Sequence, residues 1–171
     1  MEENASEGLT RPPEEHDLVA LAKEFNRLGV RYVVVGGLAM QRLGFTRATE
    51  DIDLLLLREA LNETLAKQAM CVLPDKAILE LGEERIADWG VVRVNDVITV
   101  DLMTEASGLT YEDIRGDIVP VRVGDTDIPF AGKRAMLRMK QGLREKDALD
   151  RHFLENLPDV PEAGQNTGFP S

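Results

Sequence analysis

The stretch Asp-Ile-Asp-Leu-Leu-Leu-Leu at residues 51–57 constrains the fold more than any other part of the chain. Its apolar residues fill both faces of a strand, which predicts a place in the middle of a sheet that is covered on both sides. Asp51 and Asp53 open this strand two residues apart, so their side chains share one face. Two like charges beside an apolar sheet raise each other's proton affinity unless a cation compensates them.

The sequence around this strand alternates between short strands and helices. Helical spacing of apolar residues predicts a helix over 15–28, and a β-branched run predicts a strand over 31–35. The remaining expected elements are helices over 38–44 and 58–70, broken helix and loop over 75–89, a hairpin of 90–96 and 97–103 turning at Asn95-Asp96, one helical turn over 111–115, strands over 117–123 and 125–130, and a helical segment over 132–157 with a potential break near Gly142. This order predicts an α/β or α+β fold, in which helices flank a central mixed sheet and a C-terminal helical segment closes it.

At 171 residues the chain is expected to form one domain over residues 15–157, between a polar leader at 1–14 and a proline-containing tail at 158–171. No apolar run approaches the roughly 20 residues that cross a bilayer, and the acidic N-terminus lacks the apolar core of a secretory signal. The single cysteine, Cys71, rules out an internal disulfide. We therefore expect a cytoplasmic protein with no membrane partner.

A third carboxylate lies within a later apolar run. Asp101 is flanked by valine, leucine and methionine in residues 97–103, so a solvated strand edge explains it poorly. If this strand lies beside 51–57, Asp101 can face Asp51 and Asp53. Three such carboxylates predict a two-metal site for Mg²⁺ or Mn²⁺. The alternatives are an exposed acidic strand end for the pair and a structural hydrogen bond for Asp101.

Gly36 and Gly37 lie where a predicted strand meets a predicted helix. Glycine lets the backbone approach a ligand closely, and a helix N-terminus offers free N–H groups, so phosphate is the expected ligand. A Gly-Gly pair is also common in a simple tight turn. Its position, one short helix before Asp51, favours the phosphate interpretation.

The C-terminal helical segment is locally basic, although the whole chain has a net charge of −11. Seven of the 20 lysines and arginines lie between Lys133 and Arg151, together with three acids. Like-charged neighbours four residues apart on a helix are mildly destabilising, which an anionic ligand would relieve; these pairs are Lys140 with Arg144 and Arg134 with Arg138. The alternative is a solvated face that is partly balanced by the pairs Lys146–Asp150 and Asp147–Arg151.

The acidic total argues against non-specific coating of nucleic acid, but a local basic site remains compatible with it. A phosphate cradle, a carboxylate metal cluster and a basic helix are together the groups that transfer of a nucleotidyl or phosphoryl group requires. The cations stabilise charge that develops on the phosphate oxygens, and a carboxylate accepts the proton of the attacking hydroxyl.

These residues resemble the nucleotidyltransferases of the DNA polymerase beta-like superfamily. The resemblance lies in Gly36-Gly37 after a strand, Asp51-Ile52-Asp53 opening the next strand after thirteen intervening residues, and Asp101 on a later strand. The run RMKQGLREKDALD is similar to the C-terminal helix of the small stand-alone branch that includes abortive-infection toxin-type (AbiEii-like) enzymes. The resemblance covers roughly residues 15–157, and it implies a nucleotidyltransferase fold.

The resemblance also implies roles for single residues. Asp51, Asp53 and Asp101 would bind the metals, and Asp101 would be the base. The residues implied in nucleotide binding are Gly36, Gly37, Arg47, Thr49, Lys140 and Asp147. The implied activity moves an NMP from an NTP to a hydroxyl acceptor and releases pyrophosphate. The acceptor could be an RNA end, a protein side chain or a small molecule.

Two further hypotheses remain open at the level of sequence. The chain could be a catalytically inactive protein of the same fold that binds a nucleotide or a partner. The intact set of three carboxylates argues against that. The branch that it resembles also suggests the toxin of a toxin–antitoxin module, with an antitoxin as partner.

Overall fold

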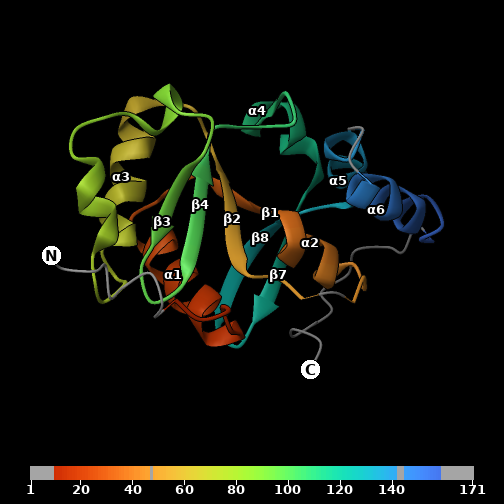
Figure 1. The fold of residues 1–171 in the computed structure, drawn as a ribbon, viewed down its shortest axis with the longest axis horizontal. Helices are drawn as coiled ribbons and strands as arrows, with labels where there is room; N and C mark the ends of the chain where they lie inside the picture. The colour runs from red at the N-terminus through yellow and green to blue at the C-terminus, as the bar shows by residue number, and fades with distance from the viewer. Residues whose placement is uncertain (1–9, 47, 142–144, 159–171) are drawn as a thin grey trace, which may run out of the picture.

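The centre of the molecule is a six-stranded mixed sheet in the order β3-β4-β2-β1-β8-β7 (Figure 1). The computed structural model describes residues 10–46, 48–141 and 145–158. The strands are β1 Tyr32–Val35, β2 Asp51–Leu56, β3 Val92–Asn95, β4 Thr99–Met103, β7 Ile118–Val123 and β8 Thr126–Ala131. Strand β2 pairs in parallel with β4, and β1 with β8, whereas the other neighbours are antiparallel. The predicted mixed sheet is confirmed.

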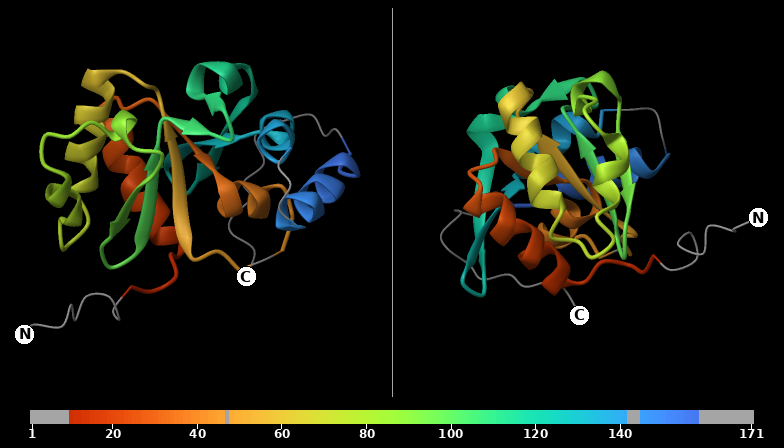
Figure 2. Two further views of the ribbon diagram at one scale, coloured as in Figure 1. Left: turned by 45° about the horizontal axis from the view of Figure 1, so that its top comes forward. Right: turned by 90° about the vertical axis from the view of Figure 1, so that its left-hand side faces the viewer.

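Helices lie on both sides of this sheet. In the left view of Figure 2, α1 and α3 lie on one side, and α2, α5 and α6 lie on the other. These helices are α1 Glu15–Arg27, α2 Gly36–Arg42, α3 Ala60–Met70, α5 Lys133–Met139 and α6 Glu145–Glu155. None of the helices in the described ranges has the length and apolar character that a membrane crossing requires.

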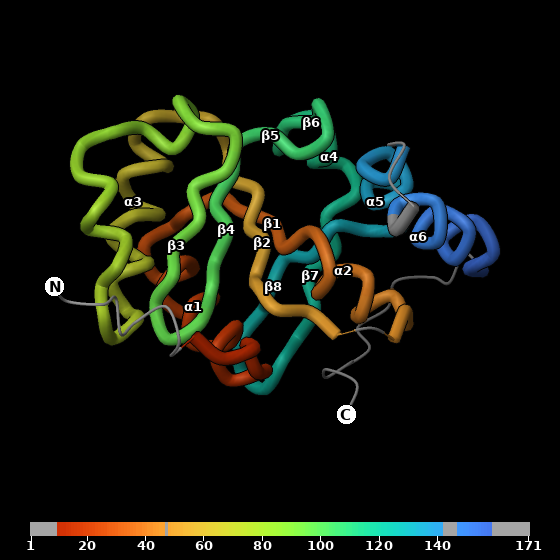
Figure 3. Tube along the Cα trace, viewed as in Figure 1, coloured from red at the N-terminus to blue at the C-terminus, as the bar shows by residue number. Residues whose placement is uncertain are grey.

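A small two-stranded sheet and a short helix follow β4 (Figure 3). They are β5 Glu105–Ala106, β6 Leu109–Thr110 and α4 Tyr111–Ile114. Three short 3₁₀ helices, η1 Ala77–Leu81, η2 Ile86–Asp88 and η3 Arg115–Asp117, complete the regular structure of the described residues. The hairpin of β5 and β6 was not predicted, because strands of two residues carry no periodic pattern.

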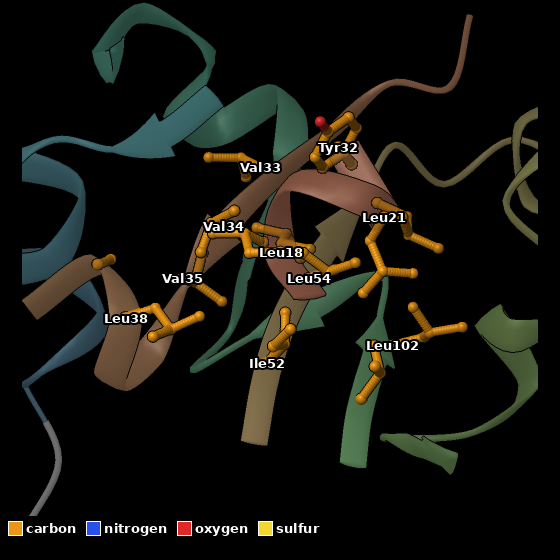
Figure 4. Packing of buried hydrophobic residues seen from close by; sticks show 14 of the residues in the cluster. Leu18, Leu21, Tyr32, Val33, Val34, Val35, Leu38, Ile52, Leu54 and Leu102 are labelled. Carbon is orange, nitrogen blue, oxygen red and sulfur yellow. The ribbon is translucent and has the colours of Figure 1, made fainter. Parts of the chain in front are cut away.

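The core packs against the face of β2 that carries its even-numbered residues. Ile52 and Leu54 point into the same cluster as Leu18 and Leu21 of α1 (Figure 4), and all four are at most 1% exposed. Burial of each such side chain stabilises the fold by roughly 1.5–3 kcal/mol. Because a slip of one residue would turn the whole strand over, this burial fixes the register of β2. The register sends Asp51 and Asp53 to the opposite face.

Two predicted details of the chain are corrected. The hairpin of β3 and β4 turns at residues 96–98, where the Asp96 amide donates to the Ile98 carbonyl at 3.0 Å, and not at Asn95-Asp96. The Asp96 carboxylate accepts the backbone amides of Asp75 and Ala77 at 3.0 Å each, which fixes this residue within the turn. The second correction concerns Trp89: the sequence predicts this tryptophan, directly before Gly90, to be a packing anchor, but its side chain is 50% exposed.

The C-terminal segment is two helices, as the potential break near Gly142 indicated. Helix α5 ends at Met139 and α6 begins at Glu145, so Lys140 lies outside both helices. The prediction that places Lys140 on a helix, in a like-charged pair with Arg144, is therefore wrong. Arg144 itself lies outside the described residues.

Candidate active site

One rung of the sheet places the charged residues of the site side by side. Across strands β3, β4, β2 and β1 the register aligns Arg93, Asp101, Asp53 and Val35. Directly opposed residues in a sheet have Cβ atoms about 4.5–5.5 Å apart. The site is therefore built by strand pairing, and its groups come from segments that are far apart in the sequence.

Asp51, Asp53 and Asp101 form a cluster in which one carboxylate oxygen of each residue lies within 4.8 Å of the others. The parallel pairing of β2 with β4 sets Asp51 opposite Thr99 and Asp53 opposite Asp101. The expectation that Asp101 would face the Asp51/Asp53 side is confirmed. Asp101 is buried, and the other two carboxylates are half-buried.

The cluster changes the protonation of its central member. The pKa of Asp53 is raised to about 7, chiefly by burial and then by the charges of Asp51 and Asp101. A hydrogen bond with Asp101 also raises the pKa, whereas the nearby charge of Lys140 lowers it. Asp53 thus holds a proton near neutral pH where a divalent cation would otherwise balance the charge.

The donor set suits a hard divalent cation. Mg²⁺ and Mn²⁺ prefer carboxylate oxygens together with phosphate oxygens and water, and three carboxylates on adjacent strands supply the first of these. The raised pKa of Asp53 is what such a cluster shows without a cation to neutralise it. The residues present therefore fit the metals that the sequence predicts.

The two glycines leave room for the cluster. Gly36 has a φ of +70°, and a Cβ atom there would lie 2.1 Å from Oδ2 of Asp53. A Cβ atom on Gly37 would lie 2.7 Å from the hydroxyl oxygen of Thr49. Thr49 donates its hydroxyl to the Asp51 carbonyl at 3.1 Å. The glycines thus bring the start of α2 directly against the strand that carries the carboxylates.

Arg93 is the charged residue of the site that sequence reasoning missed. Its Nε donates to Oδ1 of Asp101 at 2.9 Å, and its Nη2 donates to Oδ2 of Asp101 at 2.8 Å. The same Nη2 reaches Oδ2 of Asp51 at 3.1 Å. These hydrogen bonds raise the pKa of the Arg93 guanidinium above its ordinary value. The sequence does place Arg93 in a predicted strand that pairs with the strand of Asp101. A hairpin turn at Asn95-Asp96, however, does not set Arg93 opposite Asp101.

Lys140 connects the site to α6. It is buried, and its Nζ lies 3.1 Å from Oδ2 of Asp150 and 3.5 Å from Oδ1 of Asp147. Arg151 donates to the Lys140 carbonyl at 2.7 Å. The solvated acidic and basic face that was an alternative for this segment is thus wrong for Asp147 and Asp150, which are buried.

A pocket of about 770 Å³ collects most of the predicted site residues. Its lining includes Gly36, Gly37, Thr49, Asp51, Asp53, Asp101 and Lys140, together with the unpredicted Arg93. Asp147 is not part of the lining, but it contacts Lys140, which is. Arg47, the remaining predicted residue, lies outside the described residues.

Comparison with known proteins supports the fold. No protein-family model matches the chain, and no curated protein sequence matches it. Its structure is similar to that of the lincosamide antibiotic adenylyltransferase LnuA in its lincomycin-bound form, with a TM-score of 0.51 and 19% sequence identity. The match covers 87% of this chain and 100% of that one. The chain therefore has the nucleotidyltransferase fold.

The close approach of Gly36 to Asp53 can be tested with Gly36→Ala. Alanine at a positive φ costs about 1–2 kcal/mol, and its Cβ would also push the Asp53 carboxylate out of the cluster. We expect a lower melting temperature and at least tenfold weaker Mn²⁺ binding by calorimetry. Gly29→Ala is the matched control, because Gly29 has a φ of +73° and nothing within 4 Å of the added Cβ. Equal Mn²⁺ affinities in the two variants would contradict the proposed contact.

The pKa of Asp53 predicts how stability depends on pH in the metal-free protein. Because the folded pKa of about 7 lies above the ordinary 3.8, the native state binds more protons than the unfolded state between these values. The free energy of unfolding should therefore fall as pH rises through this window. Asp53→Asn removes this titration. From pH 5 to pH 8 the free energy of unfolding of the variant should therefore rise relative to that of wild type, by the order of 2 kcal/mol.

Thermal unfolding in the presence of a chelator measures this difference. The exposed acid Asp127 offers a control, since Asp127→Asn should follow the wild-type pH profile. Parallel profiles for wild type and Asp53→Asn would show that Asp53 does not carry a raised pKa.

Proposed function

We propose that the protein is a metal-dependent nucleotidyltransferase that moves an NMP from an NTP to a hydroxyl acceptor and releases pyrophosphate. The observation that carries this proposal is the cluster of Asp51, Asp53 and Asp101 in a pocket of a nucleotidyltransferase fold. Mg²⁺ or Mn²⁺ held by these carboxylates would supply charge stabilisation for the phosphate oxygens. The donor is an NTP, with ATP as the first candidate because the structural neighbour is an adenylyltransferase.

The reaction is an in-line exchange at the α-phosphorus. The acceptor oxygen forms a bond to this phosphorus, the bond to the pyrophosphate oxygen breaks, and the leaving group departs as pyrophosphate. Asp101 is the proposed base that takes the hydroxyl proton, since it lies buried at the centre of the rung. Gly36, Gly37 and Thr49 form the wall on which the phosphates of the nucleotide are proposed to lie.

Lys140 is proposed to contact the phosphates from the side of α5. Lys140 is part of the pocket lining, and its ammonium lies near the carboxylates of Asp147 and Asp150. Asp147 thus acts as a positioning residue for Lys140 and does not contact the nucleotide itself. Removing one partner of a buried ion pair typically destabilises a protein by about 3–5 kcal/mol, so the network also anchors α6.

The charges around the pocket favour a small-molecule acceptor over an RNA end. Among the described residues, the lining contains five carboxylates, including Glu50 and Glu105, and two cations, Arg93 and Lys140. Within the basic segment, Lys140 is buried and Arg138 donates to the Asp113 carbonyl at 2.8 Å, so these two cations are partly used inside the protein. The net charge of −11 acts in the same direction. The structural neighbour binds a small molecule, lincomycin.

A transfer assay tests the proposal. The protein is incubated with each α-labelled NTP, Mg²⁺ and a cell lysate, and the label is followed into RNA, protein and small-molecule fractions. We expect metal-dependent label in the small-molecule fraction, with loss of at least about a hundredfold in Asp51→Asn and Asp53→Asn because both lose a metal ligand. Asp127→Asn, an exposed acid outside the pocket, should transfer normally.

Each other outcome has a defined meaning. Label in RNA or protein would overturn the small-molecule acceptor but keep the transferase. Metal-dependent NTP binding without label in any fraction would favour an inactive nucleotide-binding protein of the same fold. No metal-dependent NTP binding at all would overturn the proposed function.

A further inference from the structure

The hydrogen bonds of Arg93 use the oxygens that a metal at this site would need. Both carboxylate oxygens of Asp101 accept from Arg93, at 2.9 and 2.8 Å, and one oxygen of Asp51 accepts at 3.1 Å. A guanidinium and a divalent cation compete for the same oxygens, because their like charges repel. Arg93 therefore neutralises part of the negative charge of the cluster.

The position of Arg93 allows it to leave these carboxylates without leaving the pocket. It comes from β3, the edge strand of the sheet, and its side chain is 58% exposed although that of Asp101 is only 8% exposed. Arg93 belongs to the pocket lining that also includes Gly36, Gly37 and Lys140. A planar fork of N–H donors that matches Asp101 in a bidentate manner also matches two oxygens of a phosphate group.

We propose that Arg93 is an exchangeable counter-ion: it holds Asp101 and Asp51 before ligands bind, and it turns to the nucleotide phosphates when a divalent metal takes those carboxylates. This inference rests on the proposed function and names a further residue of its site. The exchange replaces one pair of charge-assisted hydrogen bonds with another. Asp101 is released as a metal ligand and base by the same movement.

The exchange couples metal binding to nucleotide binding. Metal alone must displace Arg93 into solvent, so it binds weakly. When a triphosphate is present, the displaced guanidinium gains a new anionic partner, so each ligand strengthens the binding of the other. A residue that only supports the fold of the site would not produce this coupling.

Calorimetry on the full chain tests the inference with Arg93→Gln. Without nucleotide, this variant should bind Mn²⁺ about tenfold more tightly than wild type, because no guanidinium competes for the carboxylates. At saturating Mn²⁺ it should bind inorganic triphosphate about tenfold more weakly, because the phosphates lose a partner. Arg93→Lys keeps the charge but not the fork, so both shifts should have the same signs and be smaller.

Arg122 provides a matched control. It is likewise a 58% exposed arginine on an edge strand, and it pairs with a carboxylate on the neighbouring strand, Asp127, at 3.1 Å. It is not part of the pocket lining. Arg122→Gln should therefore bind both Mn²⁺ and triphosphate as wild type does.

The two predicted changes, tighter Mn²⁺ binding and weaker triphosphate binding, have opposite signs and can therefore be tested separately. If Arg93→Gln and Arg93→Lys bind Mn²⁺ no more tightly than wild type, Arg93 is a structural support of Asp101 and the exchange is wrong. If triphosphate binding is unchanged in both variants, the movement to the phosphates is wrong. If wild type and every variant bind neither Mn²⁺ nor triphosphate, both the inference and the proposed function fail.

Discussion

The parallel pairing of β2 with β4 is the constraint on which the site depends. It sets Asp53 opposite Asp101, and thereby forces three carboxylates within 4.8 Å of one another on one face of the sheet. The opposite face of the same strands carries Ile52, Leu54 and Leu102, which are essentially inaccessible to solvent. Because the side chains of a strand alternate, the core cannot pack without presenting these charges on the other face. The packing of the core therefore holds the three carboxylates close together although their mutual repulsion is unfavourable.

Several groups share the compensation of this charge. Arg93 binds two of the carboxylates, Lys140 lowers the pKa of Asp53, and burial keeps a proton on Asp53 near neutral pH. Lys140 is in turn held by carboxylates of α6. The C-terminal helix is therefore coupled to the carboxylate cluster through the buried ammonium of Lys140. A proton and two cationic side chains perform, in the protein alone, the neutralisation that metal ions are proposed to perform in the complex.

The sequence was sufficient for the parts of the site that depend on local pattern. The apolar run after Asp51 indicated a central strand, its period of two placed Asp51 and Asp53 on one face, and the isolated charge at Asp101 indicated a neighbouring strand. The resemblance to nucleotidyltransferases drew on the same residues, and the structural likeness to LnuA supports it at the level of the fold. Its narrower part, the branch of toxin-type enzymes with an antitoxin partner, stays a prediction.

The parts that depend on register could not be obtained in this way. A turn placed slightly too early moves Arg93 away from Asp101, and the turn is fixed by hydrogen bonds from the distant Asp75 and Ala77 to Asp96. Burial of Asp147 and Asp150 likewise follows from how α6 packs, which charge spacing along one helix does not reveal.

The most direct test of the proposed metal site is a crystal structure with Mn²⁺ and a non-hydrolysable NTP, with anomalous data collected at the manganese edge. The account predicts manganese bound by Asp51, Asp53 and Asp101 with the guanidinium of Arg93 on the phosphates, and a pocket with nucleotide but no manganese at these carboxylates would contradict it.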